Sequence, residues 1–292
     1  MKLFKFYFLA IALVIGVFAK AQLTNNLSFV LPEMQKSQNP PKHKGFCSKL
    51  TWNVGAGLAS YYGDLTQRAN YFRQSSFSFS VGTSYPIIPH LNARLNLSFL
   101  KLHAEDSKNL DRADLRARNL SFKTTVWDLS AMVEYDMLSL ERYKFTPYVF
   151  VGFGVFYFNP YTIDASGYKQ FLRYLGTEGQ GLDAYPGRRM YKRFETNIPF
   201  GGGVKWAATK KLTFQLEFNY RHTNTDYIDD VSRTGYPSKA LLDARNPRTA
   251  MLTWRGNEVG TGPYPTGTNL NRGNPRNNDV YYTTELKVAF KL

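Results

Sequence analysis

Cysteine is almost absent from this chain, and so are the common catalytic and metal-binding motifs. Cys47 is the single cysteine among 292 residues, so an internal disulfide is impossible and a lone thiol cannot build a cysteine metal site. The spacings HxxxH, HExxH, CxxC and GxSxG do not occur, which argues against a histidine-based metal site and against the nucleophile turn of serine hydrolases. The histidines are scattered along the chain, at His43, His90, His103 and His222.

Long apolar runs are absent as well. A helix that crosses a bilayer needs about 20 apolar residues in a row, and the run at residues 6–18 is shorter. That run follows Lys2 and Lys5 and precedes a small-x-small cleavage pattern at 19–21. These features are typical of a secretory signal peptide, so we expect residues 1–21 to be removed on export.

Aromatic residues, in contrast, are abundant. They make up 16% of the chain, although its mean hydropathy is mildly negative. A transmembrane β-barrel has this composition, because only every second strand residue meets lipid and aromatic side chains gather at the two interfaces. The end of the chain shows the corresponding alternation, with one apolar face formed by Val280, Tyr282, Thr284, Leu286, Val288 and Phe290.

The same period of two recurs along the chain, and a period of two predicts β-strands with one apolar and one polar face. We count eight such segments, at 51–62, 73–85, 91–103, 123–136, 145–158, 194–207, 212–221 and 280–290. The sequence therefore predicts an all-β fold, an antiparallel outer-membrane β-barrel of about eight strands over residues 51–292. Residues 22–50 lack periodicity and contain Asn39-Pro40-Pro41, so we expect a flexible periplasmic lead-in there.

The connections between the predicted strands fall into two length classes. Short turns, at 86–90, 137–144 and 208–211, alternate with longer links at 63–72, 104–122, 159–193 and 222–279. In outer-membrane barrels the short turns face the periplasm and the long loops face outward. An even number of strands then leaves both termini on the periplasmic side of the outer membrane.

Charged residues lie on the strand faces opposite the apolar ones. Because an Arg or Lys at the bilayer midplane costs about 2–4 kcal/mol, the face rich in Leu, Phe, Trp and Val should point to lipid and the charged face into the lumen. An eight-stranded barrel is just wide enough for side chains to fill. We therefore expect a salt-bridged lumen rather than an open pore, formed by Arg94, Asp128, Glu134, Asp136, Glu195, Lys205, Glu217, Arg221, Glu285 and Lys287.

The formal net charge is +15. For an exported barrel this indicates attraction to the anionic head groups of outer-membrane lipid and to soluble polyanions. Nucleic acid is not an expected partner.

Two groups of polar residues are candidates for a site. His222 and Ser232 lie where some barrel enzymes that modify lipids place their catalytic groups, but a histidine at a barrel rim is usually only solvated. Asp226, Asp229 and Asp230 are close enough in sequence to suggest calcium, although their spacing is not that of an EF-hand. Pairing with Arg221, Arg233 or Arg245 is the default interpretation of those carboxylates.

Glycines mark two further segments. Residues 176–181 (GTEGQG) resemble a phosphate-binding loop only superficially, since the Lys-Ser/Thr ending is missing. We expect a tight loop with glycines at positive φ. Gly201, Gly202 and Gly203 fall inside a predicted strand, where glycine suits barrel curvature or the close approach of an inward side chain. No catalytic residue, metal ligand or cofactor is predicted.

Six short segments follow one another over nearly all of residues 51–292. They are YGDL at 62–65, RARNLSF at 116–122, TPYVF to FNP at 146–160, LGTEGQG at 175–181, TDYIDDVS at 225–232 and RGNP at 272–275. Together and in this order they resemble the PorG-type outer-membrane barrels of Bacteroidetes. The chain differs from many outer-membrane proteins in ending with Leu292 rather than an aromatic residue.

The resemblance implies a non-enzymatic component of the type IX secretion and gliding machinery. Such proteins are thought to link a periplasmic ring, built from a lipoprotein and its partner, to the outer membrane. By that logic the contacts should lie on the lead-in at 22–50 and on the three short turns, for example near Glu141, Arg142, Lys144, Lys210 and Lys211. The alternatives are a structural or adhesive surface barrel acting through its long loops, a lipid-modifying enzyme and a narrow channel.

Overall fold

The computed structural model describes residues 49–66, 74–233, 235–265 and 272–291. The predicted signal peptide, Cys47 and all but the last two residues of the predicted lead-in lie outside the described residues. The described residues all fall in one compact unit, Lys44–Leu292.

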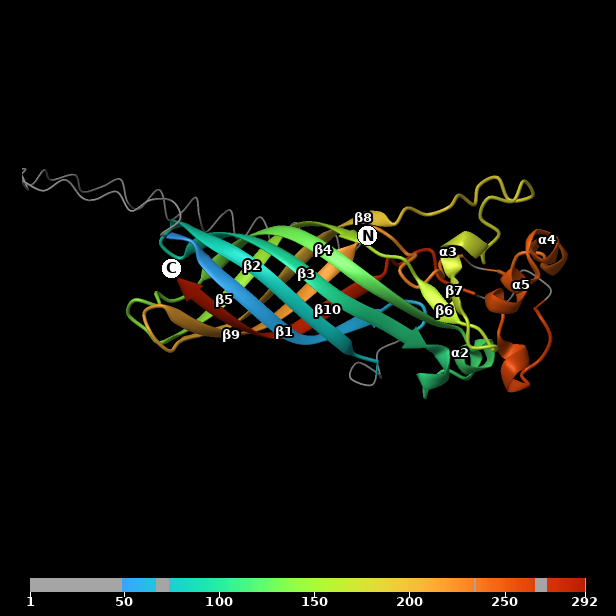
Figure 1. Cartoon of the computed structure of the whole chain (residues 1–292), viewed down its shortest axis with the longest axis horizontal. Helices are drawn as coiled ribbons and strands as arrows, with labels where there is room; N and C mark the ends of the chain where they lie inside the picture. The colour runs from blue at the N-terminus through green and yellow to red at the C-terminus, as the bar shows by residue number, and fades with distance from the viewer. Residues whose placement is uncertain (1–48, 67–73, 234, 266–271, 292) are drawn as a thin grey trace, which may run out of the picture. The chain divides into compact units, whose positions relative to one another are not determined.

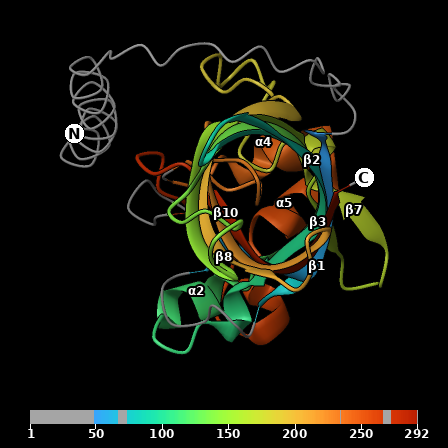
Figure 2. The same cartoon turned by 90° about the vertical axis from the view of Figure 1, so that its left-hand side faces the viewer.

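Eight long antiparallel strands close into a barrel, as the alternation predicts (Figures 1 and 2). Neighbours around the wall follow the order β3, β2, β1, β10, β9, β8, β5, β4, and the pairing of β3 with β4 closes the ring. Their bounds are β1 Thr51–Tyr62, β2 Ser76–Ile88, β3 Leu91–Glu105, β4 Ser121–Asp136, β5 Phe145–Tyr157, β8 Phe194–Ala207, β9 Leu212–Thr223 and β10 Val280–Lys291.

The largest difference from the predicted strands concerns β2. It continues through Pro86 to Ile88, where a shift in its register against β3 marks a bulge. Proline lacks an N–H for the ladder and is tolerated at such a bulge. The turn to β3 is therefore shorter than predicted and contains His90, whose φ is 71°.

The connections are short at one end of the barrel, the turn end, and long at the other, the loop end. The loop end carries a small hairpin of β6 (Tyr161–Ile163) and β7 (Lys169–Phe171), which joins β4 through the pairing of Lys123 with Tyr161. Its short helices are η3 Asp106–Lys108, α2 Ala113–Arg118, α3 Leu172–Leu175, α4 Lys239–Arg245, α5 Pro247–Thr253 and η4 Gly256–Val259. None of the helices in the described part of the chain is long and apolar enough to cross a membrane.

The outer face of the wall is an apolar band. Eight of its members are 46 to 71% exposed, namely Leu58, Phe77, Leu95, Leu129, Val151, Ile198, Leu216 and Leu286. Water around them would forfeit roughly 1.5–3 kcal/mol per large apolar side chain, whereas lipid supplies an apolar surrounding.

Aromatic side chains edge this band at both ends. Toward the turn end, the ring of Trp206 stacks with those of Phe145 and Phe214 at centroid distances of 6.2 and 5.7 Å. Toward the loop end, Tyr157 meets Phe194 at 4.9 Å. Two aromatic rows bounding an apolar band are typical of a membrane-spanning barrel.

Glycines in the middle of β8 make room for inward side chains, as expected. An added Cβ at Gly201 would lie 2.9 Å from the Phe150 ring, and one at Gly203 would lie 3.0 Å from the Tyr148 ring. Both would also lie 2.1 Å from a carbonyl oxygen of β9. The two aromatic rings therefore fill lumen space that the glycines leave open.

Candidate functional site: the filled lumen and the loop-end cap

A chain of alternating charges fills the turn-end part of the lumen. We call it the charge ladder. Successive charged atoms are 2.5 to 3.3 Å apart, and their side chains are at most 15% exposed. In order of contact from the turn end, the ladder consists of Asp136, Lys205, Glu134, Arg94, Glu217, Lys287 and Glu285.

Neutral groups complete the ladder. The Tyr148 hydroxyl donates to Glu217 Oε2 at 2.8 Å, and the hydroxyls of Ser78 and Ser80 donate to the two oxygens of Glu285 at 2.7 Å. Because a buried charge is costly unless it is paired and hydrogen-bonded, these contacts explain how seven charged side chains coexist inside the barrel.

The prediction of a salt-bridged lumen is confirmed for nine of the ten residues on which it rested. Besides the seven ladder residues, Arg221 Nε lies 3.6 Å from Asp128 Oδ1. The Asp128 carboxylate also accepts a hydrogen bond from Tyr281 at 2.9 Å. Glu195, near the loop end of β8, forms no ion pair among the described residues.

The prediction that large apolar residues face outward is wrong in the loop-end part of the barrel. There the inward face carries an apolar plug, whose members include Leu100, Leu102, Phe122, Val126, Phe156 and Phe158, none more than 1% exposed. The same cluster continues into the loops through Leu65, Ile228 and Val231. The alternation of β3 continues unbroken through this level, but its inward face changes from polar residues (Asn96 and Ser98) to apolar ones (Leu100 and Leu102). The side chains filling the lumen argue against the narrow-channel alternative.

A second polar network lies above the plug, in the loops, and we call it the cap. Arg118, at the end of α2, clamps both oxygens of Asp106 at 2.7 and 2.8 Å. It also donates to the backbone oxygens of Arg272 and Asp64. Arg272 in turn pairs with Glu178 at 2.7 Å, so two buried arginines join four separate loop segments.

Five of the six segments that carry the family resemblance meet in this cap. Glu178 Oε1 accepts from the backbone N–H groups of Ser232 and Arg233 at 2.9 and 2.8 Å. Arg272 also donates to the backbone oxygen of Asp230 at 3.1 Å, and the backbone N–H of Asn274 donates to Asp64 at 2.9 Å. The resemblance thus rests largely on residues that build the cap, while the segment 146–160 lies mostly in β5.

The glycines at 176–181 adopt the geometry expected of them. Gly176, Gly179 and Gly181 have φ values of 65°, 77° and 74°, a region that side chains with a Cβ rarely adopt. They turn the chain so that Thr177 and Glu178 point into the cap, where both are fully buried. The segment is a structural loop that presents a carboxylate to backbone donors.

The cap also contains carboxyl groups without a basic partner. The Tyr61 hydroxyl lies 2.6 Å from Asp229 Oδ2 and 2.7 Å from Asp279 Oδ1. One hydroxyl has one proton to donate, so a proton shared with the carboxyls is needed to satisfy all three groups. Asp226 is buried, and its Oδ2 makes no hydrogen bond in the described part of the chain.

Burial and mutual repulsion set the charge state of these groups. Burial raises the pKa of Asp226 to about 9, and the neighbouring charges of Asp229 and Asp64 add to that rise. Burial likewise raises the pKa values of Asp229 and Asp279 well above their usual range. For Asp230 the pKa rises to about 7, because burial outweighs the charge of Arg272. At neutral pH this part of the cap therefore binds protons.

The default pairing expected for Asp226, Asp229 and Asp230 is wrong. Among the described residues, none of the three forms an ion pair with Arg221, Arg233 or Arg245. Arg221 pairs with Asp128 inside the barrel, and Arg245 donates to the backbone oxygen of Gln180.

The three carboxyls also have different partners. Asp229 faces Tyr61, Asp230 accepts from Thr177 and Tyr191, and Asp226 contacts Ser232. Within the described ranges, no group of three or more His, Cys, Asp or Glu side chains is arranged to hold a metal ion.

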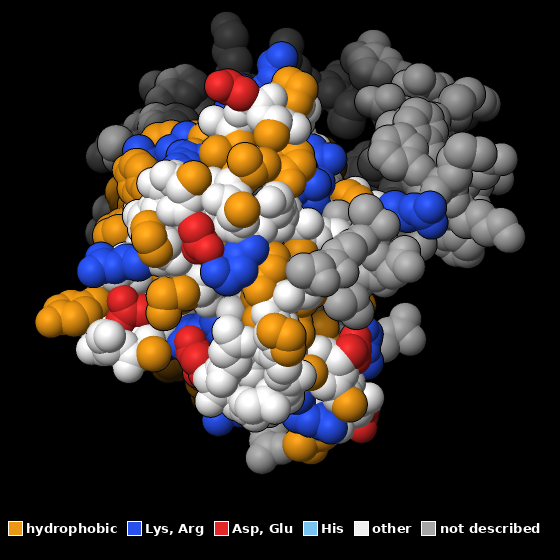
Figure 3. Space-filling view, turned by 90° about the vertical axis from the view of Figure 1, so that its right-hand side faces the viewer, with side chains coloured by type: hydrophobic (Ala, Val, Ile, Leu, Met, Phe, Trp, Pro, Cys, Tyr) orange, Lys and Arg blue, Asp and Glu red, His pale blue; other side chains and the backbone are white. Residues whose placement is uncertain are grey.

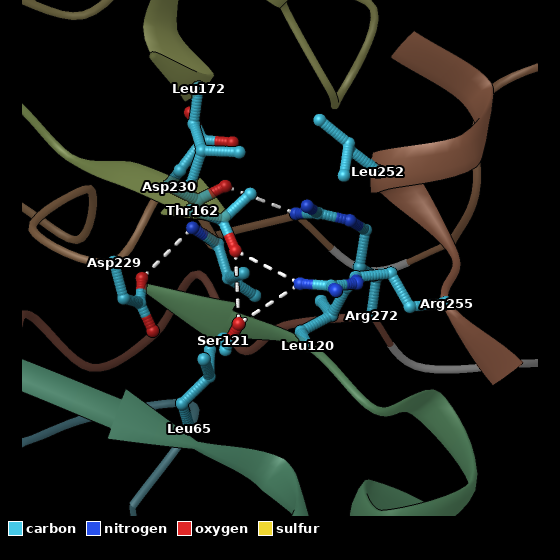
Figure 4. A pocket seen from close by; sticks show the side chains of 11 residues that line it. Leu65, Leu120, Ser121, Thr162, Leu172, Asp229, Asp230, Leu252, Arg255 and Arg272 are labelled. Atoms are coloured by element: carbon cyan, nitrogen blue, oxygen red, sulfur yellow. Dashed lines mark hydrogen bonds between the residues drawn. The ribbon is translucent and has the colours of Figure 1, made fainter. Parts of the chain in front are cut away.

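A cavity of about 10 Å³ lies within the cap (Figure 4). It is lined by apolar side chains together with Asp229, Asp230, Arg255 and Arg272. Arg255 donates to the hydroxyls of Ser121 and Thr162, both at 3.0 Å, across one side of it. This volume has room for about one water molecule and none for a substrate.

The residues considered for lipid chemistry are not brought together. Ser232 is buried in the cap, whereas the side chain of His222 is exposed on β9, beside the inward-facing Arg221. His103 Nδ1 lies 2.7 Å from the Ser76 hydroxyl, and His90 Nδ1 lies 2.8 Å from the backbone oxygen of Asp136. Each histidine in the described part of the chain thus occupies a separate place in the wall or its turns.

Several solved barrels are similar to this chain. Neisserial surface protein A is 10% identical, with a TM-score of 0.42, over 84% of this chain and 97% of its own. Ail, the attachment invasion locus protein of Yersinia pestis, is 9% identical in its complex with the heparin analogue sucrose octasulfate, with a TM-score of 0.38 over 82% and 96%. A major outer membrane protein from Thermus thermophilus is 12% identical, with a TM-score of 0.39 over 82% and 98%.

No curated protein matches the chain. Residues 40–237 match the family described as the outer membrane protein beta-barrel domain. This match spans more than half of the sequence and agrees with the closed eight-stranded wall and its apolar band. The chain belongs to the outer membrane protein beta-barrel domain family.

Proposed function

We propose that this chain is a non-enzymatic barrel subunit of the type IX secretion and gliding machinery, linking a periplasmic ring complex to the outer membrane. The observation that carries the proposal is the filled interior. The charge ladder and the apolar plug fill the barrel in succession, and the cap covers its loop end, so the surfaces of the protein rather than its lumen are available to bind a partner. The six ordered sequence segments supply the link to the secretion family.

The turn end offers a surface suited to a partner. Exposed apolar side chains lie there beyond the aromatic row, including Met137 and Leu138, which directly follow the end of β4. Ile87, Ile88 and Tyr143 add to them, each more than half exposed. Apolar side chains clustered on an exposed surface are typical of protein–protein contacts.

Charged residues surround those apolar ones. Glu141, Arg142, Lys144, Lys210 and Lys211 are all exposed, and within the described residues none of them forms an ion pair. Since short turns of such barrels face the periplasm, the proposal places this surface, and both termini, on the side of the periplasmic ring.

A crosslinked affinity purification from outer membranes of the native host tests the proposal. The intact barrel should recover the ring lipoprotein and its partner. The double variant M137D/L138D should lose at least 90% of that recovery, while the loop-end variant M251D, which also alters an exposed methionine, should retain it. Heat-modifiable gel migration checks that each variant is folded. Clean recovery of the intact barrel without the ring proteins would contradict the proposal.

A structural or adhesive surface barrel is the second candidate. It is favoured by exposed apolar side chains on the loop end, where Leu110, Met251 and Val259 are 62, 64 and 50% exposed. Apolar, basic and acidic groups are intermixed on that face (Figure 3). Loss of adhesion after removal of the loops by surface proteolysis would favour this second role.

A further inference from the structure

Basic and aromatic side chains alternate on the outside of the barrel at the loop end. They come from the end of β5, from the β6–β7 hairpin, which stands out from the wall in Figure 2, from α3 and from the residue just before β8. We call this surface the cationic rim and define it by Tyr157, Tyr161, Lys169, Arg173, Tyr174 and Arg193.

Aromatic rings hold the cations of the rim in place. Lys169 Nζ lies 3.8 Å from the centre of the Tyr161 ring. The guanidinium carbon of Arg193 lies 5.5 Å from the Tyr157 ring and 5.9 Å from the Tyr174 ring. Arg173 also lies 5.9 Å from the Tyr174 ring. Cation–π contacts at such distances position a cation without neutralising its charge.

Hydrogen bonds to neutral oxygens orient the two arginines further. Arg193 Nη1 donates to the hydroxyls of Tyr157 and Tyr174, both at 3.2 Å. Arg173 Nε donates to the backbone oxygen of Tyr191 at 2.7 Å. Each guanidinium has five N–H donors in a fixed fork, so most of its donors are left for an anion.

The rim has an excess of positive charge. Among the described residues, Lys169, Arg173 and Arg193 form no ion pair, and the exposed Lys192 adds a fourth cation. The nearby Asp164 already accepts hydrogen bonds from two backbone N–H groups and from Gln170, at 2.8 to 3.0 Å. This arrangement favours an anionic occupant.

The cationic rim is continuous with the apolar band. Phe194 follows Arg193 directly and is 69% exposed, and its ring meets that of Tyr157 at 4.9 Å. Aromatic rows of barrels lie at the membrane–water interface. The cations of the rim therefore lie at the depth of lipid head groups, with apolar surface immediately beside them for an acyl chain.

We propose that the cationic rim binds the phosphate of a phosphorylated lipid in the leaflet around the loop end. Arg173 and Arg193 contact the phosphate, because the guanidinium fork matches phosphate oxygens. Lys169 and Lys192 add charge at the edge, and the acyl chain packs against Phe194. A soluble protein partner would leave this continuity with the apolar band unexplained.

Lipid retention in nanodiscs tests the proposal. The full chain is placed in phosphatidylcholine discs doped with monophosphoryl lipid A, extracted into mild detergent, and the lipid that stays bound is quantified by mass spectrometry. The double variant R173Q/R193Q should retain at least tenfold less lipid. The control R189Q/R276Q loses the same charge from exposed loop-end arginines outside the rim and should change retention less than twofold.

Three further arms make the outcome decisive. The native chain should retain dephosphorylated lipid A no better than R173Q/R193Q retains the phosphorylated lipid. The charge-preserving variant R173K/R193K should retain at least half as much phosphorylated lipid as the native chain. Heat-modifiable migration should be the same for all variants, since the substituted side chains lie on the surface. Equal retention by R173Q/R193Q, equal retention of the dephosphorylated lipid, or complete displacement by inorganic phosphate would overturn the proposal.

Discussion

The charge ladder and the cap are both buried polar networks, but they satisfy their carboxylates in different ways. In the ladder, every acid lies within 3.3 Å of a base contributed by another residue of the wall. In the cap, Glu178 has Arg272, whereas Asp229 and Asp279 rely on the Tyr61 hydroxyl and on backbone N–H groups.

The difference follows from the backbone. Strands satisfy their own N–H and C=O groups across the wall, so ladder side chains are free to pair with one another. Irregular loops leave backbone N–H groups without such partners, and buried ones must find acceptors. Asp229 accepts from the N–H of Val231, and Asp279 from that of Ile228. Carboxyls in the cap thus replace the hydrogen bonds that a sheet would have made.

Removing the central carboxylate of the ladder should lower the free energy of unfolding more than any other change considered. Glu217 contacts Arg94, Lys287 and Tyr148, so E217A leaves two buried cations without their shared partner. Removal of one member of a buried ion pair costs on the order of 3–5 kcal/mol. Urea unfolding in lipid vesicles should show that loss for E217A. For E195A, which removes a carboxylate that forms no ion pair among the described residues, the loss in unfolding free energy should be less than about 0.5 kcal/mol. Equal losses for the two variants would contradict a stabilising role of the ladder ion pairs.

Breaking the cap should act locally. In R272A, Glu178 loses its ion pair at 2.7 Å, and a local penalty of about 3 kcal/mol raises the open population of the cap roughly 100-fold. Limited proteolysis within the loops should accelerate by about that factor, while urea unfolding of the wall changes little. If R272A instead unfolds the wall together with the cap, the two networks are one cooperative unit.

The cap should weaken as the pH rises. Asp226, Asp229 and Asp279 have raised pKa values in the folded protein, so the folded state binds more protons than the unfolded one and stability falls with increasing pH. The loss begins above the ordinary aspartate pKa of 3.8 and continues to about 9, the folded pKa of Asp226. Loop proteolysis should be several-fold faster at pH 8.5 than at pH 5.5.

The variant D226N isolates this pH effect. It keeps the shape of the side chain and removes one titrating group, so the ratio between the two rates should shrink. The protease's own activity at each pH is calibrated with an unfolded substrate. An unchanged ratio in D226N would show that Asp226 does not contribute.

The smallest effect should come from an exposed ion pair. Lys239 Nζ lies 2.6 Å from Asp243 Oδ2 on the surface of α4. Such (i, i+4) pairs contribute about 0.3–0.5 kcal/mol, so K239A should leave loop proteolysis within about twofold of the native rate. An effect as large as that of R272A would show that burial does not distinguish the two pairs.

The wall could be predicted from the sequence because each strand has a period of two. The bounds 51–62 and 194–207 coincide with those of β1 and β8. The inward positions of Arg94 and Glu217 followed from the cost of charge in lipid. The inward position of the ladder residues could therefore be predicted from the alternation alone, although the order in which they pair could not.

The apolar plug could in principle have been predicted from the sequence. After Phe99, the apolar residues move to the other face of β3, as Leu100 and Leu102, while Lys101 and His103 take the outward positions. This change in the face that carries the apolar residues marks where the wall leaves the lipid. Assigning the apolar residues of the whole strand to the lipid-facing side does not predict the plug.

The cap could not be predicted in this way. Arg118 and Asp106 are joined through α2 and η3, and Glu178 and Arg272 are 94 positions apart. Irregular loops have no period, so their partners depend on the path of the chain. For the same reason the arginines expected near Asp226 were the wrong ones.

If the cap is stabilised separately from the filled barrel, the two parts should open independently of each other. Hydrogen–deuterium exchange on the chain in nanodiscs, with and without R272A, measures the protection of both parts at once. Exchange should be faster at the cap amides of Ile228, Val231 and Ser232 in the variant, with unchanged protection in β3, β9 and β10. Simultaneous loss of protection in the cap and in those strands would show that cap and barrel are stabilised together.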